Sequence, residues 1–204
     1  TVTKNITLTA VYTNKPQTET IKYHYNFTDK DGNYNDTTFE DDNHPKNTNA
    51  IVKSLGDVGF KAPIGYEFRG WATARDSNKI EYAAGDPVFV DANGDNNLYA
   101  VWQVKKYTVT WVNWDNKELE KDKDVPYGAT PEYDGDAPTK AGNAQYSYKF
   151  TGWNPAVSPV TGDATYKATY TKEANIYKVT YDLDGGEWTE ATNEFPYEYK
   201  ATVE

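Results

Sequence analysis

The chain has 204 residues and a formal net charge of −10, and it contains neither Cys nor Met. Its acidity removes the positive field that attracts nucleic acids and anionic membranes, so neither is an expected partner. Without Cys there is no disulfide, thiolate nucleophile or thiolate metal ligand. No apolar run approaches the roughly 20 residues that span a bilayer, so membrane insertion is not expected. Because there is no initiator Met, we expect a processed or excised segment.

The composition predicts the fold class. Aromatic residues make up 15% of the chain, with 18 Tyr and 6 Trp. Tyr, Trp, Thr and Val suit a pleated surface that is half buried. We therefore expect a mostly β protein, α+β at most.

The first predicted element is a strand at residues 8–12 that ends in Ala-x-aromatic. The same ending recurs at residues 98–102 and 166–170. A closing strand that recurs marks the end of a repeat. Residues 1–14 are therefore predicted to be the last strand of a preceding repeat.

Opening strands recur in the same way. Residues 21–27, 107–111 and 177–181 each place a large apolar or aromatic side chain at every second position. This period of two predicts a strand with one buried face. Each strand runs into residues that tolerate positive φ and suit a tight hairpin turn. These turn residues are Asp31-Gly32, Asp115-Asn116 and Asp184-Gly185.

One segment of the chain has helical spacing. Its apolar residues fall on one helix face, with Thr48 or Asn49 as the cap at its start. Gly56 and Gly59 limit the predicted helix to about two or three turns. The apolar residues on that face are Ile51, Val52, Leu55 and Val58.

A Phe-x-Gly-Trp motif occurs at residues 68–71 and again at 150–153. Glycine inside a strand indicates a bulge or a close approach of two backbones. The large rings beside it are expected in the core rather than on a binding surface, because the motif recurs. The predicted core residues are Tyr23, Tyr25, Phe68, Gly70, Trp71, Ala100, Trp102, Val109, Trp111, Phe150, Gly152, Trp153, Ala168 and Tyr170.

The order of these motifs predicts the domain organisation. Residues 20–103 form a first full repeat, which is longer and carries insertions, and residues 104–172 form a second. Residues 174–204 begin a third, incomplete repeat. Each repeat is expected to be a small β-grasp-like unit. The linkers between the repeats are short and are not rich in Gly or Ser, so we expect the tandem repeats to be arranged as an elongated rod.

The fixed order of motifs resembles the Listeria–Bacteroides repeat, also called the internalin B-repeat. The resemblance rests on the opening strands, on Phe-x-Gly-Trp, on the closing Ala-x-aromatic strands and on the Val-Pro-Tyr-Gly-Ala segment at residues 125–129. It implies a small β-grasp-like module used in tandem on surface proteins of bacteria, mostly Gram-positive. Such modules act as spacers or as parts of adhesins.

Two tryptophans are candidate ligand-binding residues. Trp114 and Trp188 lie at or just past predicted hairpin turns, where an exposed ring can stack on a sugar. The alternative is that they are ordinary exposed apolar residues, which are common.

Runs of Asp and Asn around residues 29–33 and 91–95 resemble the start of a calcium loop. Neither run continues as an EF-hand, and turns use the same residues, so we expect no metal. No cofactor is expected. No nucleophile motif accompanies His24 or His44, the two histidines of the chain, so we do not expect an enzyme.

The sequence therefore predicts a structural spacer or stalk segment of an adhesin-like protein on the bacterial cell surface or cell wall. The alternative is a module that binds a host glycan or host surface protein through exposed aromatics or through the insertions of the first full repeat. The expected partners also include neighbouring repeats and a second copy, which would pair head-to-tail through the terminal strands.

Overall fold

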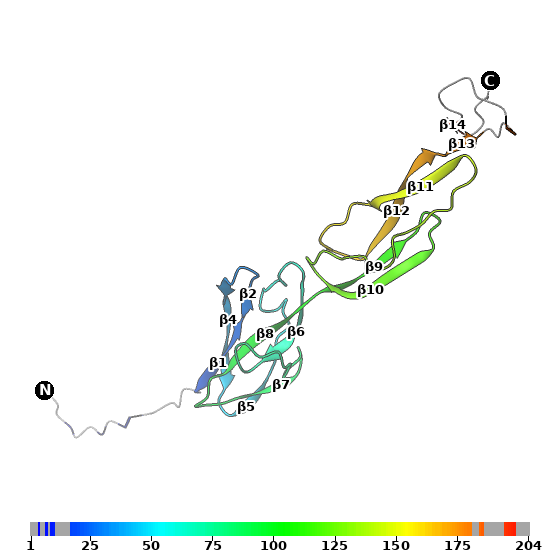
Figure 1. Ribbon diagram of the computed structural model, residues 1–204. Helices are drawn as coiled ribbons and strands as arrows, with labels where there is room; N and C mark the ends of the chain where they lie inside the picture. Colours follow the sequence, from blue (N-terminus) through cyan, green and yellow to red (C-terminus); the bar gives the residue numbers. More distant parts are fainter. Residues whose placement is uncertain are drawn as a thin grey trace. The chain divides into compact units, whose positions relative to one another are not determined.

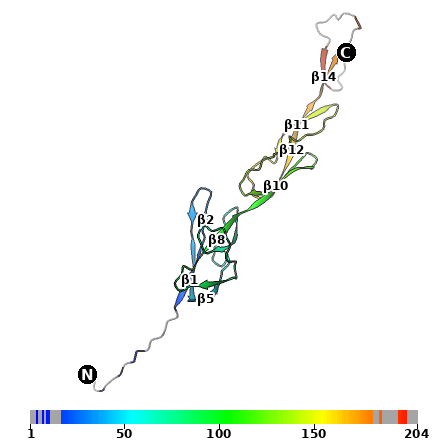
Figure 2. The same ribbon diagram turned by 60° about the horizontal axis from the view of Figure 1, so that its bottom comes forward.

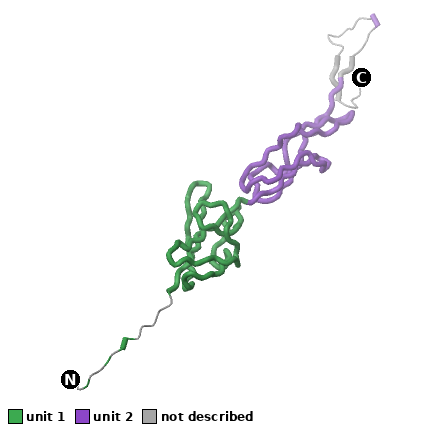
Figure 3. The backbone as a smooth tube through the Cα atoms, turned by 90° about the horizontal axis from the view of Figure 1, so that it is seen from below, with its two compact units in different colours: residues 1–104 green, residues 105–204 purple. Residues whose placement is uncertain are grey.

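The computed structural model describes residues 4, 7, 9, 10, 17–180, 184, 185 and 194–198, of which 178–180 and 194–198 are described as backbone only. The chain divides into two units, Thr1–Val104 and Lys105–Glu204 (Figure 3). Every regular element of the described residues is a β-strand. The prediction of a mostly β fold is therefore confirmed.

Unit 1 contains eight of the strands. They are β1 (Thr18–His24), β2 (Phe27–Thr28), β3 (Tyr34–Asn35), β4 (Thr38–Pro45), β5 (Thr48–Ile51), β6 (Tyr66–Ala72), β7 (Pro87–Val90) and β8 (Asn97–Val104). Unit 2 contains the remaining ones. They are β9 (Lys106–Val112), β10 (Glu118–Pro126), β11 (Tyr146–Asn154), β12 (Ala164–Ala174), β13 (Ile176–Thr180) and β14 (Glu194–Glu198).

Each unit is built on a four-stranded sheet with the same strand order (Figure 1). In unit 1 the order is β4-β1-β8-β6, and in unit 2 it is β10-β9-β12-β11. The outer strands pair antiparallel with their neighbours, whereas the first and last strands pair parallel in the middle. Figure 2 shows β8 beside β1 in unit 1. This is the arrangement expected of a β-grasp-like sheet.

The other strands of the described residues form two-stranded sheets. In unit 1, β2 pairs with β3, and β5 pairs with β7. In unit 2, β13 pairs antiparallel with β14. The predicted strand at residues 1–14 lies almost wholly outside the described residues, so it stays a prediction.

The predicted helix at residues 51–58 is wrong. Ile51 ends β5 and is 62% exposed, while Ala50 and Val52 face the core. Ala50 is buried by the pairing of β5 with β7, and this period of two overrides the helical spacing. The chain then makes a single tight turn, in which the Val58 N–H donates to the Ser54 carbonyl at 3.3 Å. That turn stops at Gly59, which has φ of 72°.

The core of unit 1 is centred on Tyr23 and Trp71, which are both fully buried. Their ring centroids are 4.8 Å apart in an edge-to-face arrangement. The backbone of Lys53 provides hydrogen-bond partners for both side chains. Its N–H donates to the Tyr23 hydroxyl, and its carbonyl accepts from the Trp71 indole N–H, each at 2.9 Å. Buried Tyr and Trp need such partners, so the segment after β5 is held against the sheet.

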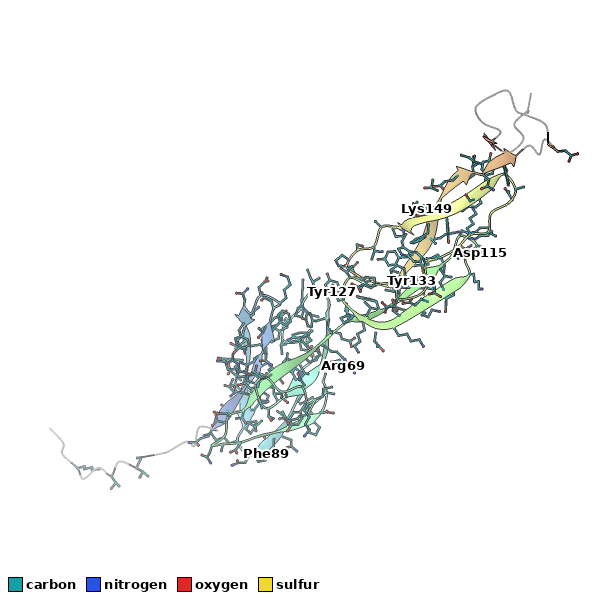
Figure 4. All side chains as sticks on the ribbon, viewed as in Figure 1. Arg69, Phe89, Asp115, Tyr127, Tyr133 and Lys149 are labelled. Atoms are coloured by element: carbon teal, nitrogen blue, oxygen red, sulfur yellow. The ribbon has the colours of Figure 1, made fainter. Side chains whose placement is uncertain are left out.

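The core of unit 2 is centred on Trp111, which is 1% exposed. The Trp153 and Tyr166 rings each lie 4.8 Å from it between centroids. The Trp111 indole donates to the Asp122 carboxylate at 2.9 Å, and Tyr133 packs on both Trp rings (Figure 4). Trp111 therefore takes the place of Tyr23, and Trp153 takes the place of Trp71.

The predicted core residues fall into two groups. The buried ones are Tyr23, Gly70, Trp71, Ala100, Val109, Trp111 and Ala168. The half-buried ones are Tyr25, Phe68, Trp102, Phe150, Gly152, Trp153 and Tyr170.

The Phe-x-Gly-Trp motif forms a bulge in both units. The strand register shifts between Phe68 and Gly70 in β6, and between Phe150 and Gly152 in β11. The two glycines have φ of 147° and 129°, values that a side chain disfavours. In unit 1 the bulge also lets another segment approach, since the Trp71 N–H donates to the Tyr82 carbonyl at 2.9 Å.

Alanine at the two glycines should therefore have unequal effects. A Cβ at Gly70 would lie 2.6 Å from Ile80 Cγ2 and 2.8 Å from the Tyr82 oxygen, whereas none of the described atoms lies within 4 Å of one at Gly152. We expect Gly152→Ala to cost about 1–3 kcal/mol of unfolding free energy through backbone strain. Gly70→Ala should cost about 1–3 kcal/mol more because of the overlap.

Urea denaturation, followed at resolved NMR signals of each unit, measures both costs. Equal losses of stability for the two variants would contradict this explanation of the motif.

Candidate functional site

The first unit carries a groove of about 260 Å³ between the β2–β3 hairpin, β6, β8 and the loop at residues 76–78. Its aromatic walls are the half-buried rings of Phe27, Tyr66 and Trp102. Ala100 and Val101 of strand β8 also line the groove. A second hollow of about 460 Å³ shares Asn78, Val101 and Trp102 with this groove and extends along β8 to Arg69 on β6. Arg69 is labelled in Figure 4.

Asn26 attaches the β2–β3 hairpin to the sheet. Its backbone has φ of 50°, and its side chain donates to the Ala100 carbonyl at 3.1 Å. The Tyr34 hydroxyl donates back to the Asn26 amide oxygen at 3.2 Å. The Trp102 indole donates to the Tyr25 carbonyl at 2.7 Å. These bonds hold Phe27 against the groove, where its ring lies 4.9 Å from that of Tyr66 between centroids.

The tip of this hairpin is closed by hydrogen bonds to Asp29. The Asp29 carboxylate accepts from the backbone N–H groups of Asp31 and Asn33 at 2.9 Å and from the Asn33 side chain at 3.0 Å. Gly32 completes the turn with φ of 83°. Hydrogen bonds from the side chain and then the backbone of Asn33 hold the pKa of Asp29 below its ordinary value.

Polar groups form the rim of the groove on the side of the loop at residues 76–78. Asp76 has φ of 62°, and its carboxylate lies 3.8 Å from the Arg75 Nε. The Ser77 hydroxyl accepts from the Lys79 backbone at 3.1 Å, which fixes the loop. Within the described part of the chain, no hydrogen bond occupies the Asn78 carboxamide.

Trp114, one predicted ligand-binding residue, lies in unit 2 and is 44% exposed. The Lys140 ammonium sits 4.8 Å from its ring centroid and 4.2 Å from that of Tyr148. A cation between two rings gives a favourable packing that needs no ligand. Trp188, the other predicted residue, lies outside the described residues.

Carboxylates in unit 2 are also engaged within the fold. Glu120 accepts from the backbone N–H groups of Asp134 and Gly135, each at 3.0 Å. Desolvation raises the pKa of Glu120, and its neighbour Asp122 adds to this effect. Asp122 in turn accepts from Trp111. The pair therefore holds the loop and the core of unit 2.

Asp91 and His24, which the sequence analysis considered for metal binding and catalysis, form hydrogen bonds within the fold. Asp91 accepts from the Asn93 backbone at 2.8 Å, as in a turn. His24 lies between Asp36 at 2.9 Å and Asn97 at 3.0 Å. Over the described residues, no group of three or more His, Cys, Asp and Glu side chains could hold a metal ion. Nor does this part of the chain contain a helix with the length and apolarity to cross a membrane.

The sequence did not identify the groove. Phe27 was predicted only as the end of an opening strand, and Tyr66 had no predicted role. The extra length of the first full repeat was the sequence signal that could have located the groove. In unit 1 the β2–β3 hairpin lies at the place where unit 2 has only a short turn between β9 and β10.

The hairpin tip has a testable electrostatic signature. The Asn33→Ala change removes the amide that most lowers the pKa of Asp29, so we expect this pKa to rise towards its ordinary value. A lowered carboxyl pKa stabilises the fold above the unfolded pKa, and this contribution is lost as the pH falls through the folded pKa. NMR titration of the Asp29 carboxyl carbon in both proteins measures the change, and an unaltered pKa would contradict the assigned hydrogen bond.

Comparison with known proteins gives similarities in sequence and in structure. No family model matches the sequence, so the resemblance to the Listeria–Bacteroides repeat stays a prediction. Over 157 residues, 66% of this chain, the sequence is 29% identical to a protein of Evansella cellulosilytica described as a Gly-rich membrane protein, and the chain spans 17% of that relative's length. A solved structure of streptococcal high identity repeats in tandem, domains 3–4 of a cell surface protein, aligns with 65% of this chain and 76% of that chain, at 13% identity and a TM-score of 0.26.

Proposed function

We propose that this chain is a structural spacer segment, built of tandem repeats, of an adhesin-like protein on the bacterial cell surface. The observation that carries the proposal is the repetition of one sheet topology in both units. Only Lys105 separates β8 of unit 1 from β9 of unit 2. A repeat that follows its neighbour after a single residue adds length to a stalk without adding a floppy tether.

The strand order suits a segment under tension. Because the first and last strands of each sheet run parallel, the chain enters at one end of the sheet and leaves at the other. Pulling on the chain therefore slides β1 along β8, and β9 along β12. In this shear geometry the bonds of the pair must break together, whereas a hairpin pulled at its open end breaks them one at a time.

The cellular location belongs to the same proposal. The similarity to the Evansella cellulosilytica protein, which is described as a membrane protein, supports a place at the bacterial cell envelope. The motif order shared with the Listeria–Bacteroides repeat supports a Gram-positive surface or cell wall. The role is structural rather than enzymatic, and it requires no cofactor.

The elongated arrangement follows from the short linkers of the sequence, and it stays a prediction. Head-to-tail association through residues 1–14 and 174–204 also stays a prediction, because most of these residues lie outside the described ones.

Single-molecule pulling tests the mechanical role directly. Since the chain has no Cys, introduced cysteines define the pulling points without interference. Handles at Gln17→Cys and Lys105→Cys load the β1–β8 pair in shear. Handles at Gln17→Cys and Lys46→Cys open the β1–β4 hairpin from its free ends, where the Lys46 N–H donates to the Gln17 carbonyl at 3.4 Å.

We expect the shear handles to require roughly twofold or more force at the same loading rate, because several parallel-ladder bonds share the load. Equal or lower force for the shear handles would contradict a spacer that resists tension.

A further inference from the structure

We infer that the groove of unit 1 is a binding site for a neutral oligosaccharide. This goes beyond the spacer role, because a spacer needs no ligand. The inference rests on aromatic walls, on an uncommitted polar rim and on the absence of the β2–β3 hairpin from the second sheet of the same chain.

The aromatic walls match the apolar faces of a sugar ring. Phe27 stands at 77° to Tyr66, with 4.9 Å between centroids, and at 87° to Trp102, with 6.5 Å between centroids. Phe27 therefore packs edge-to-face on both other rings, and each of the three half-buried rings lines the groove with the part that stays exposed. A pyranose carries C–H groups on its faces and hydroxyls around its edge, so rings beside a polar rim satisfy both parts.

The polar rim supplies groups that the fold itself leaves available. No hydrogen bond within the described residues occupies the Thr28 hydroxyl or the Asn78 carboxamide. An amide and a hydroxyl each donate and accept, as vicinal sugar hydroxyls do. The exposed Asp76 carboxylate accepts only, and the Arg75 Nε at 3.8 Å offsets part of its charge, so the rim has no excess of positive charge that would select a carboxylated or sulfated sugar.

The dimensions favour more than one sugar unit. The groove volume of about 260 Å³ lies just under the range of about 300–1,000 Å³ that is usual for drug-sized ligands, so it suits a small sugar unit. The neighbouring hollow of about 460 Å³ shares Asn78, Val101 and Trp102 with it. A glycan seated in the groove can therefore continue along β8.

The second unit provides an internal comparison. Tyr148 stands two residues before the motif Phe150, as Tyr66 stands two residues before Phe68. In unit 2, however, the Lys140 ammonium covers the Tyr148 ring at 4.2 Å, where unit 1 has Phe27 on its hairpin. The saccharide site is therefore specific to the first full repeat, and Tyr148 gives a matched control.

The experiment screens the full chain on an array of neutral hexose and N-acetylhexosamine oligosaccharides, with sialylated and sulfated glycans beside them. The variants are Asn78→Ala with Thr28→Val, which remove rim groups that take no part in the core, and Tyr66→Ala, which removes a wall. Tyr148→Ala and Trp114→Ala are the controls. Circular dichroism and calorimetric binding to the best neutral glycan accompany each variant.

We expect neutral glycans to bind, with a loss of affinity of about tenfold or more in the rim variant and in Tyr66→Ala. Both controls should bind like the parent chain. The inference is overturned if no neutral glycan binds, if binding is confined to charged glycans, or if the folded rim variant keeps full affinity. Loss of binding in Trp114→Ala alone would also overturn it, because the site would then lie in unit 2.

Discussion

The parallel pairing of the first and last strands of each unit is the constraint on which the rest of the structure depends. In unit 1 it joins Lys22 to Asn97 and Tyr23 to Leu98, across most of the length of the unit. Such a long-range contact carries a loop-closure cost that local hairpins do not. The aromatic core offsets this cost, because neither hairpin alone buries the ring of Tyr23 or Trp71. Both units use the same solution, with Trp111 and Trp153 in these two places in unit 2.

The same topology separates the residues of the proposed structural role from those of the proposed binding site. The core rings lie over one part of the sheet, near Lys53 in unit 1 and Asp122 in unit 2. The groove lies where β8 meets the β2–β3 hairpin, which is anchored by Asn26 and closed by Asp29. An insertion there leaves the β1–β8 pairing unchanged. The first repeat can therefore carry the proposed ligand site without losing the sheet on which the proposed spacer role depends.

Much of the fold was predictable because its signals are local. The period of two in residues 107–111 and the glycine of Phe-x-Gly-Trp are properties of single strands, and both appear as predicted. The helix at residues 51–58 failed because pairing with β7 decides the conformation of Ile51, and strand partners far along the chain are not visible in a short window. The groove was missed for a similar reason. Phe27, Tyr66 and Trp102 are far apart in sequence, and only the sheet order brings them together.

Native-state hydrogen exchange tests the central constraint most directly. If the parallel pair holds each unit, the amides of β1 and β8 should lose protection in one opening, and those of β9 and β12 in another, at the highest opening free energies of their units. The outer strands β4 and β10 should exchange in the same opening or sooner. The contrary result would be a unit in which the antiparallel β6–β8 pair kept its protection while β1 exchanged freely. In that case the antiparallel pairs, and not the parallel pair, would hold the repeat together.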